Sequence, residues 1–185
     1  ICLKALVNPG DEVVTFAPFF TEYRCWVEAM GASLEVVPPS VPDFQVDTDA
    51  FERIISAKTK AVIVNTPNNP SGVVYSEETI KKLAAILVRK SEEYGSPIYL
   101  ITDEPYREIV YDGIQVPYLT KYYDNTLVCY SYSKSLSLPG ERIGYIVIPD
   151  RIADYEHVSP AIAGAARVLG YVCAPSLFQQ VIGKC

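Results

Sequence analysis

The sequence predicts an α/β fold in three layers: a mainly parallel β-sheet flanked by helices. Short apolar runs alternate along the chain with longer segments whose apolar residues recur at helical spacing. The apolar runs are too short for helices and are nearly continuous, which is typical of buried parallel strands. The resulting βαβ order with helical crossovers indicates one sheet covered by helices on both faces.

The first part of the chain is expected to hold a helix end, a strand, an amphipathic helix and a second strand. The opening residues resemble the last turns of a helix broken at Pro9-Gly10, and a strand follows around 13–16. A second strand is predicted over 34–37. The helix between them ends at Gly31, and its predicted buried face consists of Tyr23, Trp26, Val27 and Met30.

The middle of the chain begins with a proline-rich turn at 38–42. Asp49 with Glu52 three residues later resembles a capping box and predicts a short helix that buries Phe51, Ile54 and Ile55. A buried strand is predicted over 61–64. A long helix then begins at the cap Ser76 and ends at Gly95-Ser96-Pro97, with Ile80, Leu83, Ala84 and Leu87 facing the core.

Three more strands are predicted over 98–102, 126–130 and 143–148. From Asp150 onward the pattern favours helix, with breaks at Pro160 and Pro175. The chain has no repeat, low-complexity linker or internal boundary, so its 185 residues are interpreted as one domain.

Composition narrows the range of functions. The chain has 16 Lys+Arg against 22 Asp+Glu and no basic run, so we expect neither a nucleic-acid nor a membrane surface. Its 5 cysteines form no CxxC pair and it has 1 histidine, His157, which argues against a zinc site and favours free thiols in a reducing compartment. No signal peptide or membrane span is visible, so a cytoplasmic location is expected.

Polar clusters follow three of the predicted strands, at 65–72, 103–106 and 131–142. In open α/β sheets the ligand crevice lies beyond the carboxyl ends of the strands. These clusters are therefore the first candidates for a functional site. A dinucleotide or P-loop nucleotide site is not expected, because the glycine motifs of both are absent.

Lys134 is the central candidate. A lysine after a strand is most often a surface residue, but this one lies between serines and eight residues before Arg142. Its amine is a nucleophile that condenses with a carbonyl to form a Schiff base. The flanking serine hydroxyls and the guanidinium of Arg142 are suited to hold a phosphate-bearing aldehyde beside the lysine.

The run SYSKSLSLPGERIGY, from Ser131 to Tyr145, resembles the lysine motif of the class I/II pyridoxal-phosphate (PLP) aminotransferases, which are fold-type I PLP enzymes. The elements TDEPY and NPSG resemble two further motifs of that family, in the family's order. The resemblance implies that Lys134 binds PLP as a Schiff base and shuttles a proton between the substrate Cα and the cofactor. It also makes Ser131, Ser133 and Arg142 phosphate ligands.

Asp103 on its own could equally be a helix cap. The resemblance implies that it pairs with the protonated pyridine nitrogen of PLP, that Tyr106 hydrogen-bonds the phenolic oxygen, and that Pro105 packs against the ring. Lys134, Asp103 and Tyr106 are then the catalytic residues.

Asn69 lies in a segment, NTPNNPSG, whose composition is also that of an ordinary turn. The resemblance implies that its side chain donates to the phenolic oxygen of PLP and approaches the substrate carboxylate. By the same resemblance, Phe20 corresponds to the aromatic residue that stacks on the cofactor ring, although a plain core phenylalanine would fit the sequence almost as well.

The implied function is transfer of an amino group from an L-amino acid to a 2-oxo acid by an aspartate aminotransferase-like homodimer. Residues 1–185 would be the incomplete PLP-binding large domain, with an N-terminal phosphate-loop segment and a C-terminal small domain lying outside them, and this fragment alone is expected to have little or no activity. Two alternatives stay open, a PLP-dependent C–S β-lyase and a non-catalytic PLP-binding regulatory domain. The tripeptide Glu104-Pro105-Tyr106 favours transamination.

Overall fold

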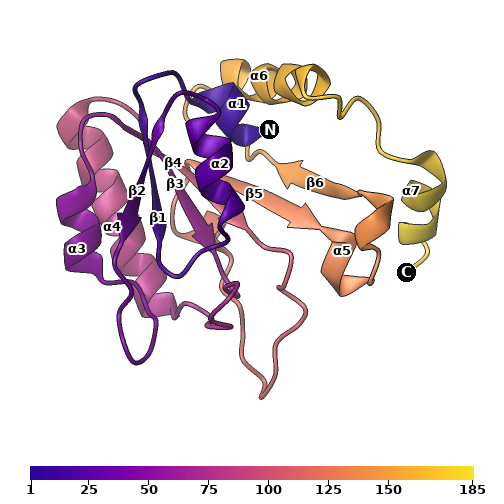
Figure 1. The fold of residues 1–185 in the computed structure, drawn as a ribbon, viewed down its shortest axis with the longest axis horizontal. Helices are drawn as coiled ribbons and strands as arrows, with labels where there is room; N and C mark the ends of the chain where they lie inside the picture. The colour runs from indigo at the N-terminus through magenta and orange to yellow at the C-terminus, as the bar shows by residue number, and fades with distance from the viewer.

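A computed structural model describes residues 1–185 (Figure 1). A 6-stranded sheet forms its centre, with the strand order β2-β1-β3-β4-β5-β6. The strands are β1 (Glu12–Phe16), β2 (Ser33–Val37), β3 (Thr59–Asn65), β4 (Tyr99–Asp103), β5 (Thr126–Ser131) and β6 (Gly144–Val147).

The sheet is mainly parallel, as predicted. β1 pairs in parallel with both β2 and β3, and β3, β4 and β5 continue in parallel. Only β6 runs antiparallel, next to β5. The order reverses at β1, because β2 lies on one side of it and β3 on the other.

Helices cover both faces of the sheet (Figure 1). They are α1 (Cys2–Leu6), α2 (Glu22–Glu28), α3 (Thr48–Ile54), α4 (Glu77–Tyr94), α5 (Tyr132–Ser135), α6 (Tyr155–Val168) and α7 (Ser176–Ile182), with the 3-10 turns η1 (Leu119–Lys121) and η2 (Pro139–Glu141). No helix combines the length and apolarity that a membrane crossing requires.

Two apolar cores lie on opposite faces of the sheet. Adjacent residues of β1, Val13 and Val14, are both fully buried, but they belong to different cores because successive strand residues point to opposite faces. One core packs against α3 and α4, and the other packs against α1, α2 and α6. The three-layer α/β prediction is confirmed.

The long helix α4 begins and ends where the sequence predicts. The Ser76 hydroxyl accepts a hydrogen bond from the Thr79 amide at 3.0 Å. At the other end Gly95 adopts a left-handed conformation, with φ at 62°, that closes the last turn.

The predicted cap of α3 is wrong by two residues. Asp47, not Asp49, is the N-cap, and its carboxylate accepts from the Ala50 amide at 2.9 Å. Asp49 lies in the first turn. Glu52 makes no reciprocal cap bond; its carboxylate instead pairs with Arg89 of α4 at 2.6 Å.

Two other predictions are corrected by packing. Trp26 is 51% exposed, because α2 buries Tyr23 and Val27 and leaves Trp26 at the edge of that stripe. Pro160 does not break the helix, since α6 runs through it from Tyr155 to Val168. A proline removes a single backbone donor, and the face carrying Val158 and Ile162 packs into the core.

Candidate active site

Four neighbouring strands bring the predicted site residues to one edge of the sheet. β1, β3, β4 and β5 are adjacent and parallel, so their carboxyl ends lie together (Figure 1). The register keeps these ends level, because Asn65 pairs with Asp103, and Asp103 pairs with Cys129. The segments that follow the four strands therefore surround one region.

Asp103 is the last residue of β4 and is half-buried. The Tyr23 hydroxyl of α2 donates a hydrogen bond to Oδ2 of its carboxylate at 2.5 Å. Burial raises the pKa of Asp103, the Tyr23 hydrogen bond lowers it, and the charge of Glu104 adds to the rise. The carboxylate forms no ion pair with another residue of this chain.

Asn65 links the ends of β3 and β4. Its side-chain amide donates to the Asp103 carbonyl at 2.8 Å, and its carbonyl accepts from the Asn69 amide at 2.6 Å. Asn68 connects the same loop to the segment after β1, through a 3.2 Å hydrogen bond to the Pro18 carbonyl. These buried asparagines fix the loop that carries Asn69. Their roles were not predicted from the sequence, although two polar residues directly after a buried strand were a usable signal.

Tyr106 follows Asp103 by three residues and is half-buried. Burial and the charge of Asp103 raise the pKa of Tyr106, and a hydrogen bond with the Asn69 side chain opposes the rise. The structure thus brings Asn69, Asp103 and Tyr106 together.

A buried ion pair holds the loop after Tyr106. Arg107 contacts the carboxylate of Glu104 at 2.6 Å, and their side chains are only 11% and 2% exposed. The same guanidinium donates to the carbonyls of Val116 and Pro117 at 2.8 and 3.1 Å, and it lies 3.9 Å from the centre of the Tyr118 ring. This clasp, which was not predicted from the sequence, ties both ends of the loop 105–118 together.

Lys134 lies on the single turn of α5, directly after β5. Ser131 caps that turn: its hydroxyl accepts from the Ser133 amide at 3.2 Å and donates to the Ser133 hydroxyl at 2.8 Å. The lysine is exposed, and its Nζ lies 5.9 Å from the centre of the Tyr106 ring. Lys134 and Tyr106, which follow different strands, therefore face one region.

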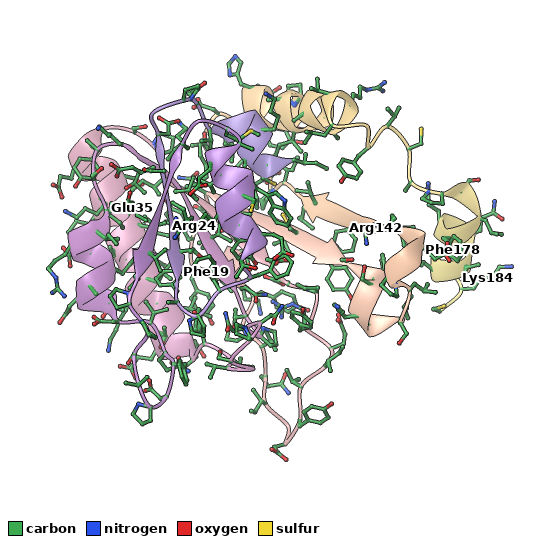
Figure 2. All side chains as sticks on the ribbon, viewed as in Figure 1. Phe19, Arg24, Glu35, Arg142, Phe178 and Lys184 are labelled. Atoms are coloured by element: carbon green, nitrogen blue, oxygen red, sulfur yellow. The ribbon has the colours of Figure 1, made fainter.

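Arg142 lies between η2 and β6 and is exposed (Figure 2). Its φ is 52°, and its Nη1 donates to the Pro139 carbonyl at 2.9 Å. It makes no hydrogen bond with either Ser131 or Ser133. The three predicted phosphate ligands are on one connected segment, but the guanidinium is turned to its own loop.

Phe20 lies between β1 and α2 and is half-buried. Its ring contacts Tyr23 and Trp26, with centroid distances of 5.8 and 6.0 Å. The sequence did not indicate that the neighbouring Tyr23 belongs to the candidate site, because its helical spacing assigned it only to the core. Its place three residues after Phe20, just past a strand end, was the available signal.

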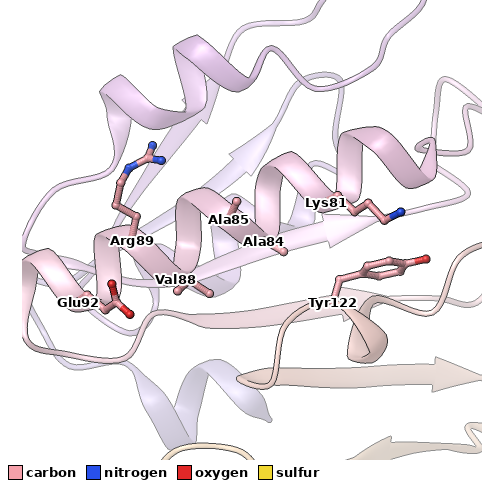
Figure 3. A pocket seen from close by; sticks show the side chains of 7 residues that line it. All are labelled: Lys81, Ala84, Ala85, Val88, Arg89, Glu92 and Tyr122. Carbon is pink, nitrogen blue, oxygen red and sulfur yellow. The ribbon is translucent and has the colours of Figure 1, made fainter.

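A shallow hollow on the helical layer lies elsewhere. It is formed along α4 and by Tyr122, with Ala84 and Val88 at its base and Lys81 and Glu92 near its ends (Figure 3). None of the predicted site residues lines it. The strand-end residues are therefore the better candidate site.

The fold is that of a three-layer α/β protein, and its candidate site lies in the loops that follow the strands. Residues 1–184 match the model of the family Aminotransferase class I and II. The chain belongs to this family.

Known relatives agree with the assignment. The chain is 35% identical over 152 residues to a probable aspartate/prephenate aminotransferase of Thermus aquaticus, a match that covers 80% of this chain and 38% of the relative. An aminotransferase structure from Eubacterium rectale has 62% identity and a TM-score of 0.97, over 100% of this chain and 46% of that one. The aspartate aminotransferase of Thermus thermophilus with maleate has 28% identity and a TM-score of 0.78, over 91% and 41% of the two chains.

The chain thus spans less than half the length of these relatives.

Proposed function

We propose that the protein is a PLP-dependent aminotransferase, which transfers an amino group from an L-amino acid to a 2-oxo acid. Membership of the family and the names of the relatives support this class of reaction. The residues at the strand ends support the use of PLP.

The observation that carries the proposal is the position of Lys134 near Tyr106, in the segment that directly follows Asp103. The lysine Nζ lies 5.9 Å from the centre of the Tyr106 ring. Asp103, three residues before Tyr106, is a partly buried carboxylate without a cation. An amine for the carbonyl, a carboxylate for the pyridine N–H and a phenol for the phenolic oxygen are the groups that PLP requires.

The Asp103 carboxylate fits the cofactor in one specific respect. Burying a carboxylate without a cationic partner is unfavourable, and here it raises the pKa of Asp103. A protonated pyridine nitrogen would offset that cost. The phenol of Tyr106 and the amide of Asn69 would together bind the phenolic oxygen, and Phe20 would contact the ring face.

The proposed phosphate ligands are Ser131, Ser133 and Arg142. The two serine hydroxyls already lie 2.8 Å apart, so both can face the same anion. Arg142 would exchange its bond with the Pro139 carbonyl for a stronger bond with a phosphate oxygen.

When bound, PLP supplies the electron sink that makes the substrate Cα–H acidic. Lys134 would take the proton from the substrate Cα and pass it to the carbon atom that the cofactor's aldehyde group contributes. Asp103 would keep the pyridine nitrogen protonated, and Tyr106 would hold the phenolic oxygen in place. These three residues are the proposed catalytic group.

We also propose how this domain fits into the whole protein. Residues 1–185 would form part of a PLP-binding large domain in a cytoplasmic homodimer. The C-terminal segment exposes large apolar side chains, since Val168, Tyr171 and Leu177 are 74%, 62% and 66% exposed. Their exposure supports the proposal that another part of the protein or a second subunit packs against this segment. The mass of the full-length protein in solution tests the dimer.

Covalent labelling tests the cofactor site. PLP is added to the purified protein, the adduct is reduced with borohydride, and the modified peptide is identified by mass spectrometry. We expect modification at Lys134, its loss in Lys134→Ala, and its persistence in Lys121→Ala, which removes an exposed lysine of η1. Modification of another lysine with Lys134 untouched would contradict the proposal.

Product analysis of the full-length protein tests the reaction. An aminotransferase converts the amino acid only when a 2-oxo acid acceptor is present. Release of pyruvate and ammonia without an acceptor would instead identify a C–S β-lyase. Labelling at Lys134 with neither reaction, across a panel of amino acids, would identify a regulatory PLP-binding domain.

A further inference from the structure

The ring of Tyr23 packs in the apolar core, whereas its hydroxyl contacts a polar group at the strand ends. The residue is only 3% exposed, and its ring packs against Phe19, Phe20 and Trp26, with centroid distances of 6.4, 5.8 and 5.9 Å. A phenylalanine would make the same ring contacts. Burying a phenol hydroxyl is unfavourable unless it is hydrogen-bonded, so the reason for a tyrosine lies with the partner of its oxygen.

That partner is the carboxylate of Asp103. The 2.5 Å hydrogen bond joins residues 80 positions apart and connects α2 with the end of β4. Oδ2 receives this bond, whereas Oδ1 accepts none. No side-chain oxygen in the structure is both fully buried and without a hydrogen-bond partner. Because Oδ1 has no partner, it is therefore accessible to solvent.

We propose that Tyr23 is a positioning residue for Asp103: its hydroxyl holds Oδ2 and thereby orients Oδ1 toward the pyridine N–H of PLP. The identity of the ligand rests on the function proposed above, whereas the orientation of the carboxylate rests on the structure. Phe20 lies three residues before Tyr23, just ahead of α2, so this segment would position both the residue at the ring face and the carboxylate at the ring nitrogen.

The hydrogen bond also sets the charge of Asp103. The titratable groups near this carboxylate are Tyr23, Glu104, Tyr106 and Cys129 of β5, and none of them is a cation at neutral pH. Tyr23 is the one that lowers the pKa of Asp103, by donating to the ionised form. Burial and the Asp103 charge in turn raise the pKa of Tyr23, which keeps its proton available as a donor.

The test is titration of Asp103 by carbon-13 NMR of its labelled carboxyl group, in the protein without PLP. Tyr23→Phe removes the donor and should shift the Asp103 midpoint to higher pH. Incorporation of 3-fluorotyrosine at position 23 makes the phenol a stronger donor and should shift the midpoint to lower pH. The matched control is Tyr75→Phe, which removes a hydroxyl from a residue that is 4% exposed in the opposite core and should leave the midpoint unchanged.

An Asp103 midpoint that is the same with tyrosine, phenylalanine and fluorotyrosine would overturn the proposal. A purely structural role would lower the melting temperature of Tyr23→Phe without moving the midpoint in opposite directions. Borohydride labelling of the same variants separates the two proposals. If Lys134 is not labelled in any of them, the PLP site fails, but the titration still decides the role of Tyr23.

Discussion

Gly144 and Tyr130 lie closer across the β5–β6 ladder than any residue with a side chain would allow. A Cβ atom added to Gly144 would lie well inside the van der Waals contact distance from the Tyr130 carbonyl oxygen. In the register of this ladder Gly144 pairs with Ser131, which leads directly into the turn of Lys134. The glycine therefore lets β6 dock beside the lysine.

Gly144→Ala should destabilise the protein by about 1–3 kcal/mol, the usual cost of overpacking, and should lower labelling of Lys134 by PLP. Gly140→Ala is the control from the same loop, because no atom beyond its immediate chain neighbours lies within 4 Å of the position that its Cβ would take, and its φ is not left-handed. Thermal unfolding measures both. Equal melting temperatures for the two variants would mean that β6 can shift to accommodate the added methyl group without a loss of stability.

The clasp of Arg107 on Glu104 predicts a large effect from one substitution. Arg107→Ala leaves the Glu104 carboxylate, 2% exposed, with only the Thr102 hydroxyl at 2.9 Å as a partner. Removing one member of a buried pair costs about 3–5 kcal/mol. Urea unfolding should therefore show a much lower midpoint for this variant.

The control is Arg24→Ala, which breaks an ion pair with Glu28 in which both side chains are about half exposed. Exposed pairs of this kind contribute less than about 1 kcal/mol. Unfolding of the two arginine variants at the same urea concentration would contradict the prediction. It would mean that the Glu104 carboxylate of Arg107→Ala is hydrated or bound by another residue.

The sequence indicated which segments form the candidate site, because each of them has a local signature. Short apolar runs mark β3, β4 and β5, and the polar residues that follow them carry Asn69, Asp103 and Lys134. The carboxyl ends of parallel strands lie at the same edge of a sheet whatever the order of the strands, so the segments that follow them lie at that edge too. The edge could be predicted from residues that are near one another in the sequence.

The rest depends on contacts between distant residues. Tyr23 and Asp103 are 80 positions apart, and helical spacing alone assigns Tyr23 to the core. The strand order that places β1 between β2 and β3 is also a tertiary property. Trp26 shows the opposite case, because its spacing fits a buried face, whereas the packed helix leaves it 51% exposed.

The cap of α3 predicts a difference between two nearby aspartates. Asp47→Ala removes the acceptor of the Ala50 amide and should cost about 1 kcal/mol. Asp49→Ala, in the first turn, removes only a favourable interaction with the helix dipole, worth a few tenths of a kcal/mol when exposed. Chemical unfolding of the two variants measures the difference, and a larger loss for Asp49→Ala would reinstate the capping box predicted from the sequence.

Asp103 predicts a specific pH dependence of stability in the protein without PLP. Burial raises its pKa in the folded state above the unfolded value of about 3.9. A raised pKa means that this group stabilises the fold below the unfolded pKa and that this contribution is lost as the pH rises through the folded pKa. At neutral pH the folded state therefore carries the cost of a sheltered carboxylate.

Asp103→Asn removes that cost while its amide oxygen can still accept from Tyr23. We expect a higher melting temperature than that of the unmodified protein at pH 7, and a difference that shrinks as the pH falls toward about 4. Asp49→Asn, an exposed control, should differ from the unmodified protein by no more than about a few tenths of a kcal/mol. An Asp103→Asn variant that is less stable by the same amount throughout would show that the carboxylate supports the fold, rather than being held ready for a cationic ligand at the expense of stability.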